Sequence, residues 1–341
     1  MRIAVVASPV TPLAPAQLGG AQAFLSDLAA GLAARGHDVL LHCAEGSVVP
    51  GVRLVTTPAP ADAARALVMP VGQPPPPTPG VVSAIARIFE DVASEDADVV
   101  SQHAFDAPAF AFAEGMPVLH TLHLPPLVPA VVAAASRVDP SRLATVSDSA
   151  AAAWRAAGID VGAVLRNGVP DMAAGGSPGP IALVAGRISP EKGIEHAVAA
   201  ARGAGLDVVV AGAQYDPDYA VDLGGARRLG ALTRPDLRAL MGVSAVTVCA
   251  VRWEEPFGMT AAEAQMAGCP VAAYSRGAMP EVVEDGLSGF LAPPDDVQAL
   301  TDAVRRCLAL DRSAVRASAL RRLTLDAAVE RYERALERAA R

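Results

Sequence analysis

The sequence predicts two α/β domains, each built around a parallel sheet with helices wound on both faces. The chain opens with an apolar run, a glycine turn, a helix and a second apolar run, which is the order of a βαβ unit. Another apolar run, which is followed by a glycine-rich segment and a helix, begins after residue 180. A length of 341 residues, 52% of them hydrophobic, suits two separate cores. These three observations predict two doubly wound, Rossmann-like domains.

In the first half, residues 1–7 form the expected first strand. A helix over 21–34 follows, because Phe24, Leu25, Leu28 and Leu32 recur at helical spacing, and residues 38–43 form the next strand. The turn between the first strand and this helix carries Gly19-Gly20 but no G-x-G-x-x-G motif, which argues against a standard dinucleotide site.

Two histidines follow strands of this first domain. We expect a helix over 81–93 and strands over 98–102, 117–123 and 144–149. His103 follows the first of these strands, and His123 ends the second. Ligands of open parallel sheets bind beyond the carboxyl ends of strands, so both histidines are placed for a function. An ordinary core or surface role is the competing interpretation, favoured for His103 and for His120 within the strand.

Two proline-rich segments predict irregular structure. Residues 69–80 include four consecutive prolines and fit neither a helix nor a central strand, so we expect a surface loop. Residues 173–180 are made of Ala, Gly, Ser and Pro, a flexible linker composition, and we place the domain boundary there.

The second domain begins with an expected strand over 181–185, followed by a segment that carries two cations. Arg187 and Lys192 lie between Gly186 and Gly193, just beyond the strand end. A guanidinium grips phosphate oxygens in a forked geometry, and an ammonium acts as a point charge. The pair suits a diphosphate group. The alternative is a surface turn in which Glu191 and Lys192 begin a helix.

The most informative stretch runs from 245 to 271. An apolar strand over 245–250 leads through a Pro-Phe-Gly turn to an Ala-rich helix that stops at Gly268. The start of that helix is a ready anion site. Two carboxylates, Glu255 and Glu263, frame it and can accept hydrogen bonds from sugar hydroxyls. Phosphate flanked by hydroxyls describes a nucleotide-sugar. A capping box from Thr260 to Glu263 is the alternative.

Composition excludes several classes. The net charge is −8 and no basic stripe is present, which disfavours nucleic acid as a partner. The four cysteines are scattered, without a C-x-x-C pair, so we expect buried thiols in a reducing compartment. No apolar run is long enough to cross a bilayer, and no signal peptide is evident. We therefore expect a cytoplasmic protein without an integral membrane segment; its oligomeric state stays open.

The paired glutamates with Pro256, Phe257 and Gly258 resemble the signature of the family 4 retaining glycosyltransferases. The segment over 186–193 resembles that family's diphosphate-binding loop, and residues 165–171 its exit into the interdomain linker. The resemblance implies a GT-B fold, with two Rossmann-like domains facing each other across a cleft. It implies an acceptor-binding domain over 1–170, joined by a C-terminal helix over about 323–341, and a nucleotide-sugar-binding domain over 171–322. Tyr332 and Leu336 fit the apolar face of that helix.

The resemblance also implies roles for individual residues. Catalytic roles fall to His123 near the anomeric carbon, to Glu255 on sugar hydroxyls, and to Arg187 and Lys192 on the leaving diphosphate. Glu263 would hold ribose hydroxyls, and Leu232 would pack on the base. The remaining donor-binding residues are Gly19, Gly20, Pro256, Phe257, Gly258 and Met259.

The implied reaction moves a sugar from a nucleoside-diphosphate sugar, such as a UDP-sugar, to a hydroxyl of a small molecule or natural product. No metal or other cofactor is expected, because cations and helix N-termini bind the diphosphate in this family. The Asp216-Pro217-Asp218 sequence resembles a metal motif of another glycosyltransferase fold and is set aside. Two alternatives remain open: a nucleotide-sugar epimerase or hydrolase on the same fold, and a non-catalytic subunit that binds nucleotide-sugars for a partner enzyme.

Overall fold

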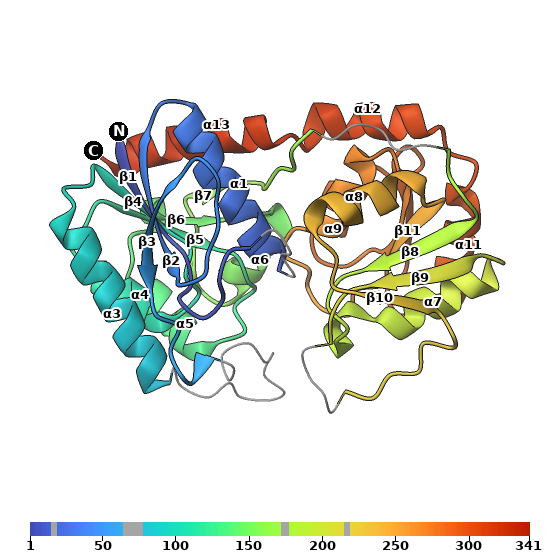
Figure 1. The fold of residues 1–341 in the computed structure, drawn as a ribbon, viewed down its shortest axis with the longest axis horizontal. Helices are drawn as coiled ribbons and strands as arrows, with labels where there is room; N and C mark the ends of the chain where they lie inside the picture. Colours follow the sequence, from blue (N-terminus) through green and yellow to red (C-terminus); the bar gives the residue numbers. More distant parts are fainter. Residues whose placement is uncertain (15–18, 64–77, 172–176, 215–218) are drawn as a thin grey trace. The chain divides into compact units, whose positions relative to one another are not determined.

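The computed structural model describes residues 1–14, 19–63, 78–171, 177–214 and 219–341 (Figure 1). The proline-rich segment, except for its last residues, and the Asp216–Asp218 motif lie outside these ranges, as does the first half of the expected linker, residues 173–176. The chain divides into two compact units. The first comprises Met1–Ala14, Ala21–Arg166 and Asp326–Arg341, and the second comprises Asn167–Leu325 with the short stretch that ends at Gly20.

The first unit contains a parallel sheet of seven strands in the order β3-β2-β1-β4-β5-β6-β7. The chain winds outward from β1 in one direction and then from β4 in the other, so the topological switch point lies between these two strands. The elements are β1 Arg2–Val6, α1 Gly20–Ala34, β2 Asp38–Ala44, β3 Arg53–Thr57, α3 Pro79–Ser94, β4 Val99–Gln102, α4 Ala107–Phe112, β5 Val118–Leu122, α5 Pro129–Ala135, the 3-10 turn η1 Pro140–Arg142, β6 Leu143–Thr145, α6 Asp148–Ala156 and β7 Ala163–Val164.

One strand of this unit ends four residues earlier than the sequence predicts. Strand β6 ends at Thr145, whereas we expected a strand over 144–149. The reason is that the Ser147 side chain accepts a hydrogen bond from the Ala150 backbone N–H and caps α6, which begins at Asp148. The N-cap of this helix therefore lies within the predicted strand.

The C-terminal helix α13, Leu325–Ala339, packs on the first unit beside α1, as Figure 1 shows. A Cβ atom on Gly31 of α1 would lie 2.5 Å from Cγ2 of Val329, so the two helices approach where α1 has no side chain. Tyr332 and Leu336 are fully buried, which confirms the predicted apolar face. Tyr332 lies 5.5 Å from the ring centroid of Phe24.

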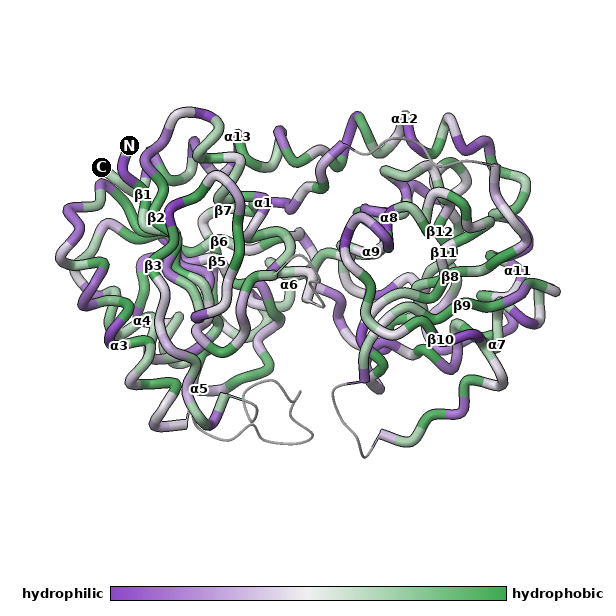
Figure 2. The backbone as a smooth tube through the Cα atoms, in the orientation of Figure 1, coloured by the Kyte–Doolittle hydropathy of each residue, from purple (hydrophilic) through white to green (hydrophobic). Residues whose placement is uncertain are grey.

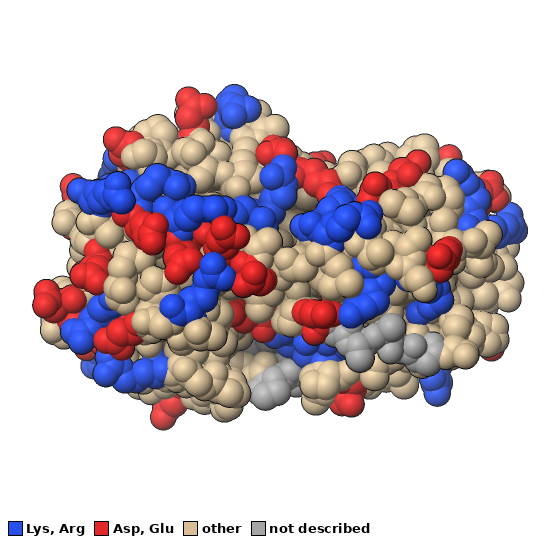
Figure 3. All heavy atoms as spheres, turned by 90° about the horizontal axis from the view of Figure 1, so that it is seen from above, with Lys and Arg blue, Asp and Glu red and all other residues tan. Residues whose placement is uncertain are grey.

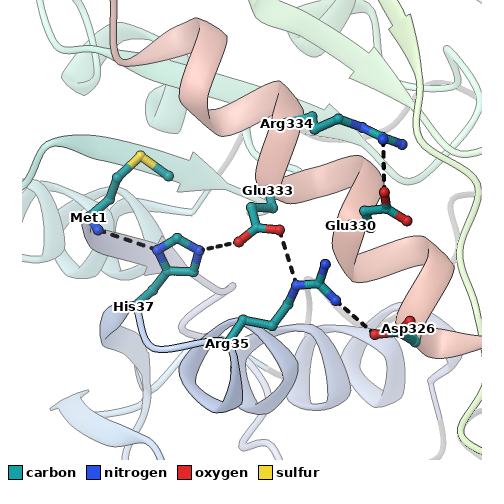
Figure 4. A network of polar contacts seen from close by, with 7 residues as sticks. All are labelled: Met1, Arg35, His37, Asp326, Glu330, Glu333 and Arg334. Carbon is teal, nitrogen blue, oxygen red and sulfur yellow. Dashed lines mark hydrogen bonds and ion pairs between the residues drawn. The ribbon is translucent and has the colours of Figure 1, made fainter.

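A polar network also binds α13 to α1 and the turn that follows it (Figure 4). The Glu333 carboxylate lies 2.8 Å from His37 Nε2 and accepts a hydrogen bond from Arg35 Nε at 3.0 Å. Arg35 also pairs with Asp326 at 2.8 Å. The hydrogen bond with His37 holds the pKa of the Glu333 carboxyl below its usual value. These contacts fix the direction of α13 along the first unit.

The second unit contains a parallel sheet of six strands in the order β10-β9-β8-β11-β12-β13, with its switch point between β8 and β11. Its elements are β8 Ile181–Ala185, the 3-10 turn η2 Pro190–Lys192, α7 Ile194–Gly203, β9 Asp207–Ala211, β10 Arg227–Gly230, α8 Arg234–Val243, β11 Val246–Cys249, α9 Met259–Met266, β12 Val271–Tyr274, α10 Met279–Val282, β13 Gly289–Ala292, α11 Val297–Cys307 and α12 Arg312–Arg322.

In both units the central strands are the most hydrophobic segments, as Figure 2 shows, and their residues are largely buried on both faces. This is the pattern of a parallel sheet covered by helices on each side. The two predicted doubly wound sheets are confirmed. Near the two ends of the segment Asn167–Leu325, the Val169 N–H donates a hydrogen bond to the Leu323 carbonyl at 2.8 Å. None of the helices in the described ranges is long and apolar enough to cross a membrane.

Candidate functional site

A pocket opens in the second unit at the carboxyl ends of β8 and β11, where the order of the strands reverses. This is the position at which open α/β sheets bind their ligands. Lys192 follows β8, and the other polar residues that line the pocket belong to the segment after β11 or to the first turn of α9. The lining includes Lys192, Cys249, Glu255, Gly258, Thr260 and Met279.

Lys192 and Glu255 meet in this pocket. Lys192 Nζ lies 2.7 Å from Glu255 Oε2, and both side chains are largely buried. The Trp253 indole donates a second hydrogen bond to the same carboxylate oxygen at 2.8 Å. Lys192 Nζ also lies 5.2 Å from the Trp253 ring centroid. Each of the three groups therefore orients the other two, and Trp253 is a member that the sequence analysis did not assign.

Two glycines allow this arrangement. Gly193 has a φ of +56°, and a Cβ atom there would lie 2.1 Å from the Ala250 carbonyl oxygen. Only glycine permits the loop that carries Lys192 to approach the end of β11 so closely. Gly277 has a φ of +59°, and a Cβ atom there would lie 2.3 Å from the Glu255 backbone nitrogen. The neighbouring Ala278 N–H donates to the Glu255 carbonyl at 2.8 Å, which anchors the loop.

The structure shows that the capping-box alternative for Glu263 is wrong. Helix α9 begins at Met259 with Gly258 as its N-cap, at a φ of +95° and without a side-chain cap. Thr260 therefore lies inside the first turn and cannot serve as the N-cap. Glu263 is buried and pairs with two arginines of α8 instead, Arg234 at 3.6 Å and Arg238 at 3.4 Å.

The other predicted donor-binding residues of this unit lie around the pocket rather than in it. Arg187 pairs with Glu191 at 3.2 Å, beside the loop that carries Lys192. Leu232 lies half-buried between β10 and α8, two residues before Arg234. Pro256, Phe257 and Met259 are buried and support the turn into α9. Among all the predicted donor-binding residues of this unit, three line the pocket: Lys192, Glu255 and Gly258.

A second pocket lies in the first unit at its own switch point, between the ends of β1 and β4. Its polar lining consists of neutral side chains: Ser8, Thr11, Gln22, His103 and His123. The sequence analysis predicted His123 here but favoured an ordinary role for His103. The structure brings the two histidines together, with His103 Nδ1 lying 2.8 Å from His123 Nε2.

Both histidines are buried and uncharged at neutral pH. Burial lowers the pKa of His123 to about 4. It lowers the pKa of His103 well below its usual value, with a smaller contribution from His123. His103 also contacts Ser101, whose Oγ lies 2.8 Å from His103 Nε2. His120 points elsewhere and stacks on Phe110 at 4.6 Å between ring centroids.

The predicted glycine pair lies at the start of α1. Gly20 is the first residue of that helix, which begins one residue earlier than predicted, and it is grouped with the second unit. A Cβ atom on Gly20 would lie 3.0 Å from Met259 Cγ, so the missing side chain leaves room at the start of α9. Gly19, immediately before the helix, is half-buried.

A signal in the composition marks Lys192 and was not used in the sequence analysis. The chain contains 28 lysine and arginine residues, and Lys192 is the only lysine among them. All the remaining residues of this set are arginines, so the chain has a side-chain ammonium only where it pairs with Glu255. An arginine there would be larger and planar, and it would not reproduce the single Nζ–Oε2 contact.

The cysteines of the chain offer no thiolate for catalysis. All four are free and buried, as the sequence predicted. Cys249 lines the Lys192 pocket, but burial raises its pKa to about 12, so it is a neutral thiol at physiological pH. Within the described part of the chain, no three His, Cys, Asp or Glu side chains lie close enough together to hold a metal ion.

Comparison with known proteins gives matches along most of the chain. Residues 18–171 match the model of "Glycosyltransferase Family 4", and residues 175–319 match that of "Glycosyl transferases group 1". A glycogen synthase from Mycobacterium tuberculosis is 33% identical over 183 residues, which is 48% of this chain and 44% of that protein. The chain therefore aligns with less than half the length of this curated relative.

Two solved structures share the fold over almost the full chain. AviGT4, a glycosyltransferase involved in avilamycin A biosynthesis, has a TM-score of 0.72 at 21% identity and covers 99% of this chain and 98% of its own. Anabaena HepE, solved with UDP-glucose, has a TM-score of 0.75 at 19% identity, with 99% of this chain and 100% of its own covered. These two structures show that the chain has the GT-B fold, and the two family matches, which together span residues 18–171 and 175–319, show that it belongs to the family 4 glycosyltransferases.

Proposed function

We propose that this protein transfers a sugar from a nucleoside-diphosphate sugar to an acceptor hydroxyl, with retention of the anomeric configuration. The observation that carries the proposal is the Lys192–Glu255 pair at the switch point of the second unit, beside the start of α9. An ammonium and a helix N-terminus suit a diphosphate, and a carboxylate suits sugar hydroxyls. The family membership supports the same assignment.

In the proposed reaction, the acceptor oxygen forms a bond to the anomeric carbon while the bond from that carbon to the β-phosphate oxygen breaks. The acceptor proton passes to an oxygen of the leaving diphosphate. Lys192 and Arg187 stabilise the negative charge that develops on the diphosphate. Glu255 holds donor-sugar hydroxyls, and Glu263 holds ribose hydroxyls. His123 contacts the donor sugar near its anomeric carbon.

The Glu255 carboxylate already accepts hydrogen bonds from Lys192 and Trp253 through the same oxygen, Oε2. This leaves Oε1 for the ligand, and an oxygen with two lone pairs accepts from adjacent hydroxyls. A carboxylate held in this way is a positioning group rather than a nucleophile. We therefore propose no covalent glycosyl-enzyme intermediate, and we propose that the leaving phosphate itself acts as the base.

We further propose that the reaction needs no metal ion, because cationic side chains and the α9 N-terminus neutralise the diphosphate. The acceptor is proposed to be a small soluble molecule or natural product. On the face seen in Figure 3, basic and acidic side chains interleave, which supports a small-molecule partner rather than a nucleic acid. Four free, buried cysteines support a reducing, cytoplasmic setting.

The first test is a thermal-shift screen of the purified protein against UDP, GDP, ADP and TDP. Each nucleotide is measured once with magnesium and once without magnesium, in the presence of EDTA. A ligand present at about 100 times its dissociation constant adds about 2.7 kcal/mol of stability. We expect one nucleotide to stabilise the protein equally under both conditions. Stabilisation by none of them, or by magnesium complexes alone, would contradict the proposed donor site.

The second test follows turnover of the sugar donor that carries this base. Product formed only in the presence of an acceptor, with the anomeric configuration of the donor sugar retained as measured by NMR, supports the proposal. Without an acceptor, release of nucleoside diphosphate at the full turnover rate indicates a hydrolase, and formation of an epimeric nucleotide-sugar indicates an epimerase. Tight donor binding without turnover over a broad acceptor panel indicates a non-catalytic subunit.

A further inference from the structure

The first unit holds a buried chain of three side chains that ends at His123. Ser101 Oγ lies 2.8 Å from His103 Nε2, and His103 Nδ1 lies 2.8 Å from His123 Nε2. Ser101 is completely buried, and each histidine is 6% exposed. The rings of His103 and His123 lie 5.1 Å apart between centroids, at an interplanar angle of 29°. Both histidines line the pocket at the switch point.

Two neutral imidazoles joined by one hydrogen bond hold a single proton between the facing nitrogens. Either His103 donates from Nδ1 and His123 Nε2 accepts, or His123 donates from Nε2 and His103 Nδ1 accepts. Because each neutral ring carries one N–H, the choice fixes the other end of both rings. In the first case His103 Nε2 is an acceptor and His123 carries its proton on Nδ1. In the second case His103 carries its proton on Nε2, and His123 Nδ1 is an acceptor.

Ser101 decides between the two arrangements. A buried serine hydroxyl has one proton to donate, and His103 Nε2 is the one hydrogen-bond partner of its oxygen among the described residues. If His103 donated to Ser101, the serine proton would be buried without an acceptor, which is costly. If Ser101 donates to His103 Nε2, the buried O–H of Ser101 and the N–H of His103 both have acceptors, and the one remaining N–H belongs to His123, which lines the pocket. The hydrogen-bond direction therefore runs from Ser101 through His103 to His123.

We propose that Ser101 and His103 are positioning residues that fix His123 as its Nδ1–H tautomer and so present a hydrogen-bond donor to the ligand. His123 Nδ1 makes no hydrogen bond with a described residue, and the ring lines the pocket. A donor at this nitrogen holds a ligand oxygen but cannot accept the acceptor's proton. In combination with the proposed function, on which this last step rests, His123 is a polar contact rather than the general base.

The aromatic surroundings hold the two rings in this orientation. Tyr332 of α13 lies 5.9 Å from the His103 ring centroid, and Phe24 of α1 lies 6.4 Å from that of His123. Neither contact offers an acidic group that would favour a charged imidazolium. The neutral state of both rings, which burial enforces, makes the tautomer rather than the charge the property that the serine controls.

The test is a measurement of histidine tautomers by long-range ¹H–¹⁵N NMR on the ¹⁵N-histidine-labelled, full-length protein without ligand. The six histidines are assigned through single substitutions. We expect His123 to carry its proton on Nδ1 in the unsubstituted protein. In Ser101→Ala we expect a mixture of tautomers or the opposite one, and in Ser101→Thr, which restores the hydroxyl, the original state. Thr57→Val, which removes another buried hydroxyl of the same sheet, is the control.

A proton on His123 Nε2 in the unsubstituted protein, or an unchanged tautomer in Ser101→Ala, would overturn the inference. His103→Asn is the second variant, should Ser101→Ala fail to fold, and we expect it to shift the His123 signals as well. With an active donor and acceptor, Ser101→Ala should lower kcat about tenfold with little change in the donor KM, and Ser101→Thr should recover most of it. If NMR shows the expected tautomer but the protein turns over no donor, the proposed function is refuted, and the inference about Ser101, His103 and His123 stands.

Discussion

Lys192 Nζ lies 2.7 Å from Glu255 Oε2, although the two residues are 63 positions apart in the sequence. If Lys192 neutralises a leaving diphosphate and Glu255 holds sugar hydroxyls, Lys192→Ala and Glu255→Gln should each lower kcat at least about tenfold, the scale of one lost charged contact. Steady-state kinetics with circular dichroism as a check of folding measures this. Near-normal rates in both variants would sink the site assignment.

Lys192→Arg is the informative companion variant because it keeps the charge. The chain uses arginine at its 27 other basic positions, so composition alone would predict a tolerated change. The larger planar group cannot occupy the same position between the Trp253 ring and Glu255 Oε2. We expect a loss of kcat similar to that of Lys192→Ala. Arg305→Lys, at an exposed pair on α11, is the matched control and should leave kcat unchanged.

A chemical experiment uses Lys192 as the single lysine of the chain. An amine-selective acylating reagent can modify one ε-amine, that of Lys192, besides the N-terminal amine. The side chain is 21% exposed, so we expect slow modification that abolishes turnover. The nucleoside diphosphate found in the thermal screen should protect Lys192 but not the N-terminus, as read by peptide mass spectrometry. Equal protection of both amines, or of neither, would argue against diphosphate binding at Lys192.

Glu263 separates two kinds of contribution. Its carboxylate pairs with Arg234 and Arg238, and its side chain is 10% exposed. Glu263→Gln removes the carboxylate charge that faces two largely buried guanidinium groups, so we expect a loss of about 1–3 kcal/mol in the free energy of unfolding. Glu330→Gln, at an exposed pair with Arg334, should cost less than about 0.5 kcal/mol. Urea denaturation measures both.

The same variant tests the ribose role. If Glu263 holds ribose hydroxyls, Glu263→Gln should weaken the binding of the nucleoside diphosphate while leaving that of inorganic pyrophosphate unchanged, as measured by isothermal titration calorimetry. If both ligands weaken equally, Glu263 acts only through the structure of α8 and α9. If neither changes, the carboxylate serves stability alone.

The sequence predicts the sheets, the order of the elements and the segments that carry the polar site residues, because strand periodicity, glycine turns and helix stops are local signals. It places Lys192 and Glu255 on loops after two strands, but their contact depends on the strand order β8-β11, which is a tertiary property. For the same reason His103 is undervalued, since its significance comes from His123, which follows the neighbouring strand β5. The capping-box alternative arises because Thr260 and Glu263 match a short pattern, while the actual N-cap, Gly258, is set by a left-handed backbone conformation.

Buried histidines make the stability of the first unit sensitive to acid. Burial lowers the pKa of His120 to about 4, with a smaller contribution from Arg142. In the unfolded chain a histidine binds a proton below about pH 6.5, whereas the folded protein leaves His120 neutral until about pH 4. Between these values the unfolded state binds more protons than the folded state. The free energy of unfolding therefore decreases, as the pH is lowered, by about 1.4 kcal/mol per pH unit for this group. Above pH 6.5 the contribution is constant.

His120→Phe tests this prediction, because a phenyl ring can keep the stacking with Phe110 and does not titrate. Removing the buried His120 Nδ1, which has no hydrogen-bond partner among the described residues, should not destabilise the protein at pH 7.5. At pH 5 the variant should be more stable than the unsubstituted protein by about 2 kcal/mol, the product of 1.5 pH units and the slope above. Urea denaturation at both pH values measures the difference. Equal pH dependence in the two proteins would show that His120 is protonated in the folded state or that the site relaxes to admit water.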